Sequence, residues 1–360
     1  MQNSFYFFNE RYATRFHIAR RLAAKGWTRA VCPEQADFSD QNLILNDEIS
    51  QHLEYKHLLW QLCERYCPQV MPLSYCVNDD NYQAVLAKIM YTHYLYPPRS
   101  DPHAVKAPPL KWILKPALLN NGDDIKLFED IDALRLYYDN PRRLGGEHVI
   151  QQYITNPALI GGRKYTFRIS ALLTNFAGVL LNKHGYINIS ALPFDLSQGL
   201  SNRKMHITNY VLDGEFAHIE QRATQEVPEF AEIYRQMVTI VKKILEAILT
   251  LAPAYLQRQK IKKMEIFGFD FMLDQEKKLW LLEINQSPDA PTFEENSLEA
   301  VLWTPFWQNI VDNFVLPIAL NTPFPKHPPE SMLEILTAND CDNARLRLRA
   351  FLKKVKILKV

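Results

Sequence analysis

The sequence has little of what marks a secreted or membrane-spanning protein. None of its 360 residues lies in a run approaching the roughly 18 apolar residues that a transmembrane helix requires. The opening sequence MQNSFYFFNERYATRF has no basic start followed by an apolar core, so we expect no signal peptide. The five cysteines are odd in number and irregularly spaced, which favours a reducing compartment over a disulfide framework. These absences predict a cytoplasmic protein.

An excess of charge of one sign is also missing. Lys and Arg number 41 against 40 Asp and Glu, giving a formal net charge of +1. No overall field therefore draws the chain to nucleic acid or to a membrane, and we expect neither as a partner. The basic run from Arg345 to Lys359 is a local exception. It is either a solvated amphipathic helix or a docking surface for an acidic protein tail or an anionic membrane.

The hydrophobic pattern predicts an α/β protein with several packed units. Residues 228–250 repeat apolar side chains every three or four positions, which predicts one long amphipathic helix. Strands are expected over 4–8, 110–115, 148–154, 165–173 and 179–181, and a helix over 11–25. We expect four parts: an N-terminal α/β subdomain over 1–52, a central lobe over 53–152, a C-terminal lobe with a metal site over 153–320, and a basic tail over 321–360.

The segment GFDFMLDQEKKLWLLEIN predicts two strands joined by a short polar turn. If Asp274 faces Leu279, then Asp270 lies directly opposite Glu283, with Asn285 on the same side two residues further along. Two opposed carboxylates repel one another unless a cation lies between them. Three oxygen donors in this arrangement suit magnesium.

The same register divides the hairpin into two faces. It predicts an apolar face built from the pairs Leu273–Trp280, Phe271–Leu282 and Phe269–Ile284. Met272 and Leu281 would lie beside the carboxylates, which is typical of a cleft. The alternative is that both carboxylates simply face solvent on a one-sided sheet.

Basic side chains occur on two of the predicted strands. Lys164, Thr166 and Arg168 share one face of a strand, and two cations without an acid beside them suit phosphate or carboxylate oxygens. A solvated edge strand is the plain alternative. Lys115 ends another strand, and the loop over 118–124 that follows could bind phosphate through backbone amides, although an ordinary turn would look the same.

The polar segment His206-Ile207-Thr208-Asn209 groups an imidazole, a hydroxyl and an amide. Such a group is usually a turn or a helix cap. Its functional meaning depends on which other motifs accompany it.

Taken in order, the segments WILKP, VIQQYITNPALIGGRKYTFRI, HITN, EIFGFDFML and LWLLEINQSP resemble successive motifs of the tubulin-tyrosine-ligase-like family. The early segment YKHLLWQLCERYCPQVMP also resembles that family. The resemblance implies an ATP-grasp fold, in which two α/β lobes clamp ATP. It implies phosphate contacts from Lys115 and Lys164, with Arg168, Thr208 and Asn209 at the transferring group. It further implies a nucleotide pocket lined by Gln151, Gln152, Tyr153, Ile154 and His206, and magnesium bound by Asp270, Glu283 and Asn285.

The implied reaction has two steps. ATP phosphorylates a carboxylate on an acceptor protein, which would be tubulin or another protein with an acidic tail. The amine of a free amino acid, glutamate or another, then displaces phosphate. Thr166 stands where the family usually has Asp, and Asn188 where it usually has Arg, so we expect Arg203 or Lys204 to supply the missing charge. The alternatives are a degenerate ATP-grasp protein that binds nucleotide and a partner without transfer, and a ligase that joins small molecules.

Overall fold

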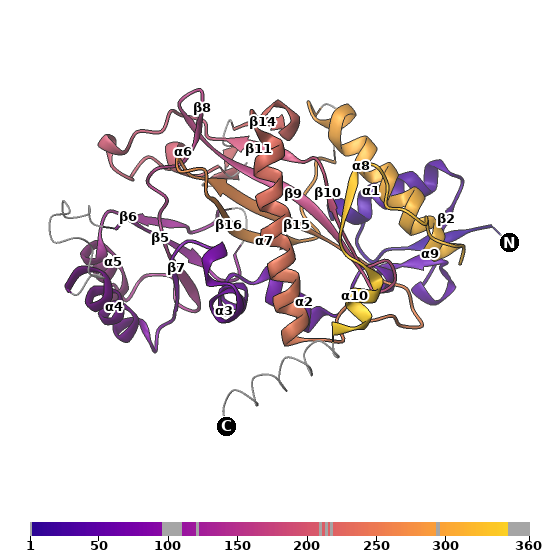
Figure 1. Ribbon diagram of the computed structural model, residues 1–360, viewed down its shortest axis with the longest axis horizontal. Coiled ribbons are helices and arrows are strands. Elements are labelled where there is room, and N and C mark those ends of the chain that lie inside the picture. The colour runs from indigo at the N-terminus through magenta and orange to yellow at the C-terminus, as the bar shows by residue number, and fades with distance from the viewer. Residues whose placement is uncertain are drawn as a thin grey trace.

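The computed structural model describes residues 2–95, 110–119, 122–208, 211–212, 215–216, 219–292 and 296–344. These residues form the mixed α/β architecture that the hydrophobic pattern predicts (Figure 1). Within these ranges no helix has the length and apolarity needed to cross a membrane. Asn209 and the basic run over 345–359 lie outside the described residues.

An eight-stranded sheet forms the centre of the molecule. Its long middle strand β9 (Arg163–Thr174) pairs on one side with β15 (Met264–Leu273), which in turn pairs with β16 (Leu279–Gln286). Along its other edge, the first half of β9 pairs with β11 (Tyr186–Ile189) and the second half pairs with β10 (Val179–Asn182). The remaining strands are β8 (Leu159–Ile160), β14 (Glu220–Ala223) and β17 (Met332–Leu336).

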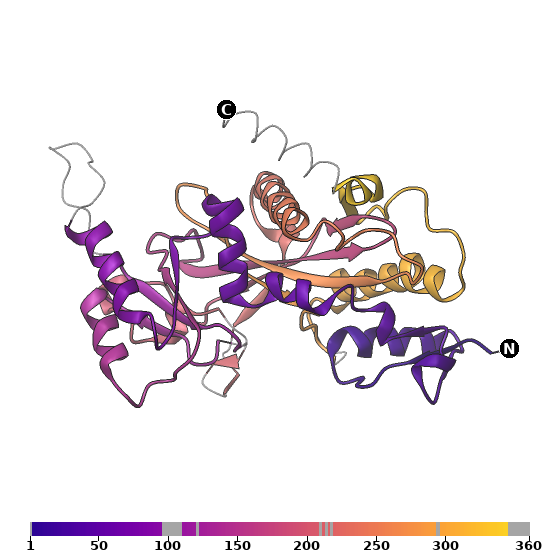
Figure 2. The same cartoon turned by 90° about the horizontal axis from the view of Figure 1, so that it is seen from below.

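Alternation along β9 gives this sheet two different faces. Phe167 and its neighbours of the same parity are buried against α7 (Phe230–Leu251), the long helix that the apolar repeat predicts (Figure 2). Two shorter helices, α2 (Asp47–Glu54) and α3 (Lys56–Tyr66), complete this core. The opposite face is apolar only toward one end, where Leu172 joins a second core. The rest of this face is polar and lines a cavity.

A four-stranded antiparallel sheet forms a second lobe, in the order β4-β7-β5-β6. Helices α4 (Tyr82–Met90) and α5 (Ile131–Asp139) pack on it around Trp112, Leu114 and Ile150. Because β4 and β5 both pair with β7, the residues on either side of the proline-rich segment over 97–109 belong to one lobe. The strands are β4 (Ser74–Val77), β5 (Trp112–Pro116), β6 (Lys126–Phe128) and β7 (His148–Gln152).

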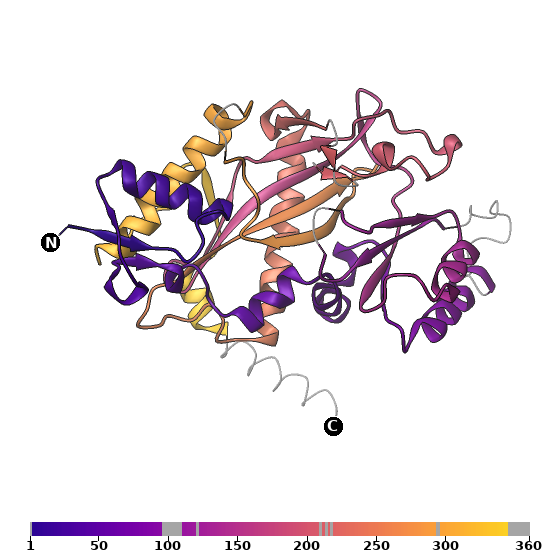
Figure 3. The same cartoon turned by 180° about the vertical axis from the view of Figure 1, so that it is seen from behind.

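The N-terminal unit is a small parallel sheet with one helix. Its strands are β1 (Ser4–Tyr6), β2 (Thr28–Arg29) and β3 (Phe38–Ser39), and its helix is α1 (Ala13–Ala24). It packs on the helical run that continues from Glu299–Trp303 through α8 (Thr304–Ile310) and Val311–Val315 to α9 (Leu316–Ala319) (Figure 3). Shorter elements are α6 (Arg203–His206), β12 (Val211–Leu212), β13 (Glu215–Phe216) and α10 (Ala338–Asp342).

The β15–β16 hairpin has the predicted register over half of its length. Phe269 pairs with Ile284 and Asp270 with Glu283, as expected. A β-bulge then shifts the register, so that Phe271 pairs with Leu281 and Met272 with Trp280. The predicted pairs Phe271–Leu282 and Leu273–Trp280 are therefore wrong, because the bulge opposes two residues of one strand to one of the other. As a result Leu281 is fully buried in the core, and Leu282 lines the cavity beside Glu283.

Gly178, in the turn between β9 and β10, allows a test of how closely β17 packs against that turn. Its φ is +82°, and an added Cβ would lie 2.1 Å from the carbonyl oxygen of Leu336 on β17. Gly26 has the same φ of +82° but nothing within 4 Å of an added Cβ. We expect Gly26→Ala to lower the free energy of unfolding by about 1 kcal/mol, and Gly178→Ala by roughly 3 kcal/mol because the clash adds to the backbone strain. Equal losses in urea unfolding would contradict the placement of β17.

Candidate active site

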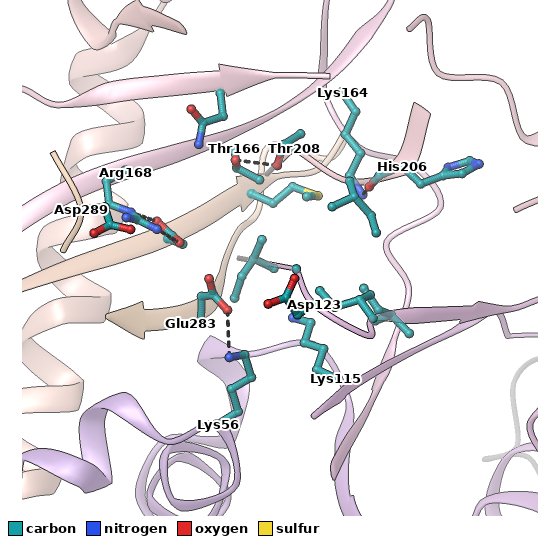
Figure 4. A pocket seen from close by; sticks show the side chains of 18 of the residues that line it. Lys56, Lys115, Asp123, Lys164, Thr166, Arg168, His206, Thr208, Glu283 and Asp289 are labelled. Carbon is teal, nitrogen blue, oxygen red and sulfur yellow. Dashed lines mark hydrogen bonds and ion pairs between the residues drawn. The ribbon is translucent and has the colours of Figure 1, made fainter. Parts of the chain in front are cut away.

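A cavity of about 380 Å³ lies between the polar face of the eight-stranded sheet and the four-stranded sheet of the second lobe. Both lobes line it, with Lys115 from β5 on one side and Lys164 and Arg168 from β9 on the other (Figure 4). Of the predicted site residues within the described ranges, all line this cavity except Asn285. The lining members are Lys115, Gln151, Gln152, Tyr153, Ile154, Lys164, Arg168, His206, Thr208, Asp270 and Glu283.

The predicted magnesium ligands lie together. The Asn285 side-chain nitrogen is 3.2 Å from Asp270 Oδ2 and 3.4 Å from Glu283 Oε1. The described residues include no group of three or more His, Cys, Asp or Glu placed to hold a metal. Two carboxylates and an amide fit magnesium, which binds few protein oxygens and keeps water or phosphate oxygens as its other ligands.

Cations on two sides compensate the opposed carboxylates. Arg168 holds Asp270 through two hydrogen bonds, of which Nη2–Oδ2 is 2.5 Å. Burial raises the pKa of Asp270 to about 6 although Arg168 opposes this. Burial would also raise the pKa of Glu283, but the charges of Lys56 and Lys115 outweigh it and lower that pKa to about 2. Glu283 is therefore ionised throughout the physiological range.

The two cavity lysines differ from these paired charges because no carboxylate contacts them among the described residues. Lys115 is 7% exposed and donates to Gln151 Oε1 at 2.8 Å. Lys164 is 4% exposed and donates to the Tyr153 hydroxyl at 3.1 Å and to the His206 carbonyl at 2.8 Å. Burial lowers the pKa of Lys115 to about 8, and burial together with the charge of Lys115 lowers that of Lys164 to about 7. A bound anion would stabilise both ammonium groups.

His206 acts on this cavity through its neighbours. Its Nε2 lies 3.0 Å from the carbonyl oxygen of Gly199, and its Nδ1 lies 3.0 Å from the Tyr153 hydroxyl. A carbonyl can only accept, so Nε2 carries the proton and Nδ1 accepts from Tyr153. The ring thus fixes Tyr153, and the His206 backbone carbonyl holds Lys164. Burial lowers the pKa of His206, which keeps the ring neutral.

The positions that depart from the family pattern are neighbours in the sheet. Asn188 on β11 lies directly opposite Thr166 on β9, and Gln221 on β14 donates to Asn188 Oδ1 at 2.9 Å. The Thr166 and Thr208 hydroxyls are 2.9 Å apart. These four side chains form an uncharged row along the cavity.

The expected replacement of charge by Arg203 or Lys204 does not occur in this structure. Arg203 donates to the carbonyl oxygen of Gly122 at 2.9 Å, and neither residue is part of the cavity lining. Both residues lie on the short helix α6, from which Arg203 contacts the loop that begins at Gly122.

Sequence reasoning missed several lining residues, above all Lys56 and Asp289. Lys56 begins α3, and its Nζ lies 2.7 Å from the carbonyl oxygen of Leu119 and 3.7 Å from Glu283 Oε2. Asp289 lies beside Arg168 in the loop after β16 (Figure 4). Neither stands in a distinctive motif, because a lysine at a helix start and an aspartate in a loop are usually solvated.

The N-terminal unit supports one wall of the cavity. His17 on α1 is 2% exposed, and its Nε2 lies 2.9 Å from the carbonyl oxygen of Pro291, which lines the cavity. Its ring stacks on Trp307 at a centroid distance of 4.8 Å and an interplanar angle of 11°. Burial and the charge of Arg21 lower the pKa of His17 to about 4, so the ring is neutral and donates to Pro291.

Comparison with known proteins shows the family to which the chain is similar. The model of the Tubulin-tyrosine ligase family matches residues 50–322, three quarters of the chain. The chain belongs to this family. The N-terminal unit over residues 2–49, including His17, precedes the matched segment.

Curated relatives carry names of tubulin-modifying enzymes. "Probable alpha-tubulin polyglutamylase Ttll1" of Tetrahymena thermophila is 24% identical over 75% of this chain and 77% of its own length. "Tubulin glycylase 3D" of the same organism is 30% identical over 49% of this chain and 18% of its own length. "Probable tubulin polyglutamylase TTLL2" of Homo sapiens is 27% identical over 49% of this chain and 31% of its own length. The chain thus spans less than a third of these last two relatives.

The Arg168–Asp270 pair allows a direct test of the buried charges. Arg168→Met leaves the Asp270 carboxylate buried without the guanidinium that binds both of its oxygens. We expect a loss of about 3–5 kcal/mol in the free energy of unfolding at pH 8. Adding Asp270→Asn removes the uncompensated charge and should restore most of that loss. A double variant no more stable than Arg168→Met would show that the two side chains do not compensate one another.

Proposed function

We propose that this chain is an ATP- and magnesium-dependent ligase that joins an amino acid to a carboxylate of an acceptor protein. One observation carries the proposal: two buried lysines, neither of them in ion-pair contact with a described carboxylate, line the same cavity between two lobes as two opposed carboxylates. Lysines without acid partners suit phosphate, and opposed carboxylates suit a hard cation. The relatives' names support an amino acid as the added group and tubulin, or another protein with an acidic tail, as the acceptor.

Residues of both lobes would hold the nucleotide. Lys115 and Lys164 would contact its phosphates through ammonium groups that no described carboxylate contacts. Gln151, Gln152, Tyr153 and Ile154, at the end of β7 and just beyond it, would line the base pocket. Because the lysines come from different sheets, a bound triphosphate would bridge the two lobes and fix their relative orientation.

The first chemical step would activate the acceptor. An oxygen of the acceptor carboxylate attacks the terminal phosphorus of ATP, a new O–P bond forms, and the bond to ADP breaks. Arg168, already oriented by Asp270, would stabilise the charge on the transferring group. Magnesium bound by Asp270, Glu283 and Asn285 would neutralise charge on the phosphate oxygens.

The second step would form the new amide. The nitrogen of the incoming amino acid attacks the acyl carbon, the C–N bond forms, and the C–O bond to phosphate breaks. Inorganic phosphate leaves, and the donor ammonium releases a proton in addition to the one carried by phosphate. The uncharged pair Thr208 and Thr166 would bind the reacting groups by hydrogen bonds, and Asn209, outside the described residues, is proposed for the same site.

A nucleotide-dependent binding module is the second candidate function. The observation that favours it is the uncharged row defined above, Thr166, Thr208, Asn188 and Gln221, in which no described side chain is a cation. A protein of this kind would bind ATP and a partner without transfer.

We place the reaction in the cytoplasm. All five cysteines are free thiols in the structure, and three of them, Cys63, Cys67 and Cys341, are buried. A chain with this arrangement is suited to a reducing compartment.

ATP turnover measured with each amino acid in a cell lysate tests the proposal. We expect release of ADP and phosphate that depends on one amino acid and is accompanied by a mass increment on a protein. Glu283→Ala should lose both signals, because it removes a carboxylate ionised at every physiological pH. Tight ATP binding without turnover for any donor would contradict the ligase and favour the binding module.

A further inference from the structure

The segment over 199–208, which follows β11 and includes α6, crosses from the large sheet to the second lobe. We call it the strap. On the side of the large sheet, the Lys164 ammonium donates to the His206 carbonyl oxygen at 2.8 Å, and the Thr166 and Thr208 hydroxyls are 2.9 Å apart. The last three residues of the strap line the cavity. The strap therefore forms the end of the cavity beside Lys164.

Two hydrogen bonds tie the strap to the second lobe. The Leu200 backbone N–H donates to the Glu129 carboxylate at 2.7 Å, and Arg203 Nη2 donates to the Gly122 carbonyl oxygen at 2.9 Å. Gly199 has a φ of +71°, and an added Cβ would lie 3.1 Å from Glu129 Oε1, so glycine permits this close approach. Gly122 precedes β6 and Glu129 follows it, so both bonds reach the same part of the second lobe.

These contacts are weaker than those on the other side of the cavity, where α3 joins the two lobes (Figures 1 and 4). Helix α3 belongs to the core of the large sheet, and its Trp60 indole donates to the Ser74 carbonyl oxygen on β4 at 2.9 Å. The strap has instead a small apolar cluster of Ile207 with Ile125 and Ile219.

The Glu129 side chain is also 44% exposed. Polar contacts that water reaches contribute little to stability, and regions with few buried apolar contacts open readily. The strap is thus the side of the cavity at which the two lobes separate more easily, and α3 is the side at which they stay together.

We propose that the strap is a latch that controls nucleotide exchange. With Glu129 and Arg203 engaged, the two lobes close around the nucleotide. When both contacts break, the second lobe turns away about α3, and nucleotide enters or leaves. The inference rests on the nucleotide site proposed above and adds how that site opens. Glu129 and Arg203 act through the strap, so they are positioning residues.

Stopped-flow binding of a fluorescent ATP analogue with magnesium to the full chain tests the latch. In Arg203→Met we expect the association and dissociation rate constants to rise together by about tenfold, because one hydrogen bond from a charged donor is lost. Entry and exit share the opening step, so the dissociation constant should change less than either rate. Lys204→Met, at an exposed position of the same helix, is the matched control and should leave both rates unchanged.

Glu129 offers a second pair of variants. Glu129→Ala removes the acceptor of the Leu200 N–H, and both rates should rise as in Arg203→Met. Glu129→Gln keeps an acceptor oxygen for the same N–H and should retain rates close to those of the unaltered chain. Amide hydrogen exchange over 199–208, measured without nucleotide, should be faster in Glu129→Ala than in Glu129→Gln.

The outcomes separate this inference from the proposed nucleotide site. Analogue binding with unchanged rates in Arg203→Met and Glu129→Ala would reject the latch and keep the site. Faster dissociation with slower association would also reject it, because the two residues would then shape the bound state and not the opening. Faster exchange of the strap in a chain that binds no analogue would keep the strap as the contact that opens and reject the nucleotide site.

Discussion

Two carboxylates opposed across one hairpin can remain ionised inside a protein only where cations lie beside them. Asp270 and Glu283 occupy such positions, and the rest of the cavity is arranged around that constraint. Arg168 on the neighbouring strand holds the first, and Lys56 at the start of α3 faces the second. The two carboxylates, Arg168 and Lys56 come from the β15–β16 hairpin, β9 and α3. This set of charges therefore forms only when the large sheet and α3 are packed together.

The N-terminal unit contributes to the same cavity, although it precedes the segment that matches the family. His17 reaches from α1 to the carbonyl of Pro291 and stacks on Trp307, so it joins the wall loop to the helical run behind it. Its neutral ring acts as a fixed donor at physiological pH because burial lowers its pKa to about 4. The wall that carries Asp289 is therefore fixed in part by residues far away in the sequence. This arrangement joins the unit to the helical run that shares its core.

Local alternation predicted much of the fold and part of the site. The two-residue period of β9 placed Lys164, Thr166 and Arg168 on one face, and the hairpin pattern placed Asp270 opposite Glu283, as the structure has them. The β-bulge was not predicted, because one extra residue in β16 leaves no mark in an apolar run and only packing selects which residue is extra.

Features that depend on distant contacts could not be predicted. Lys56 approaches Glu283 from more than 200 positions away, and nothing near Lys56 in the sequence signals that approach. His206 looked like a ligand-binding side chain, yet its ring fixes Tyr153 and its backbone carbonyl holds Lys164. The roles of these residues come from the tertiary structure, which a short motif does not encode.

We propose that Lys115 and Lys164, from two lobes, hold the phosphates of ATP. Calorimetric titration of ATP with magnesium at pH 8 tests it most directly. Because burial lowers the pKa of Lys164 to about 7, this lysine is mostly neutral in the free protein at pH 8, and phosphate should raise its pKa again. We expect proton uptake on binding, and less of it in Lys164→Met. The affinity for ATP should fall by about 10- to 100-fold in Lys115→Met and in Lys164→Met. Unchanged affinity in both variants would contradict it.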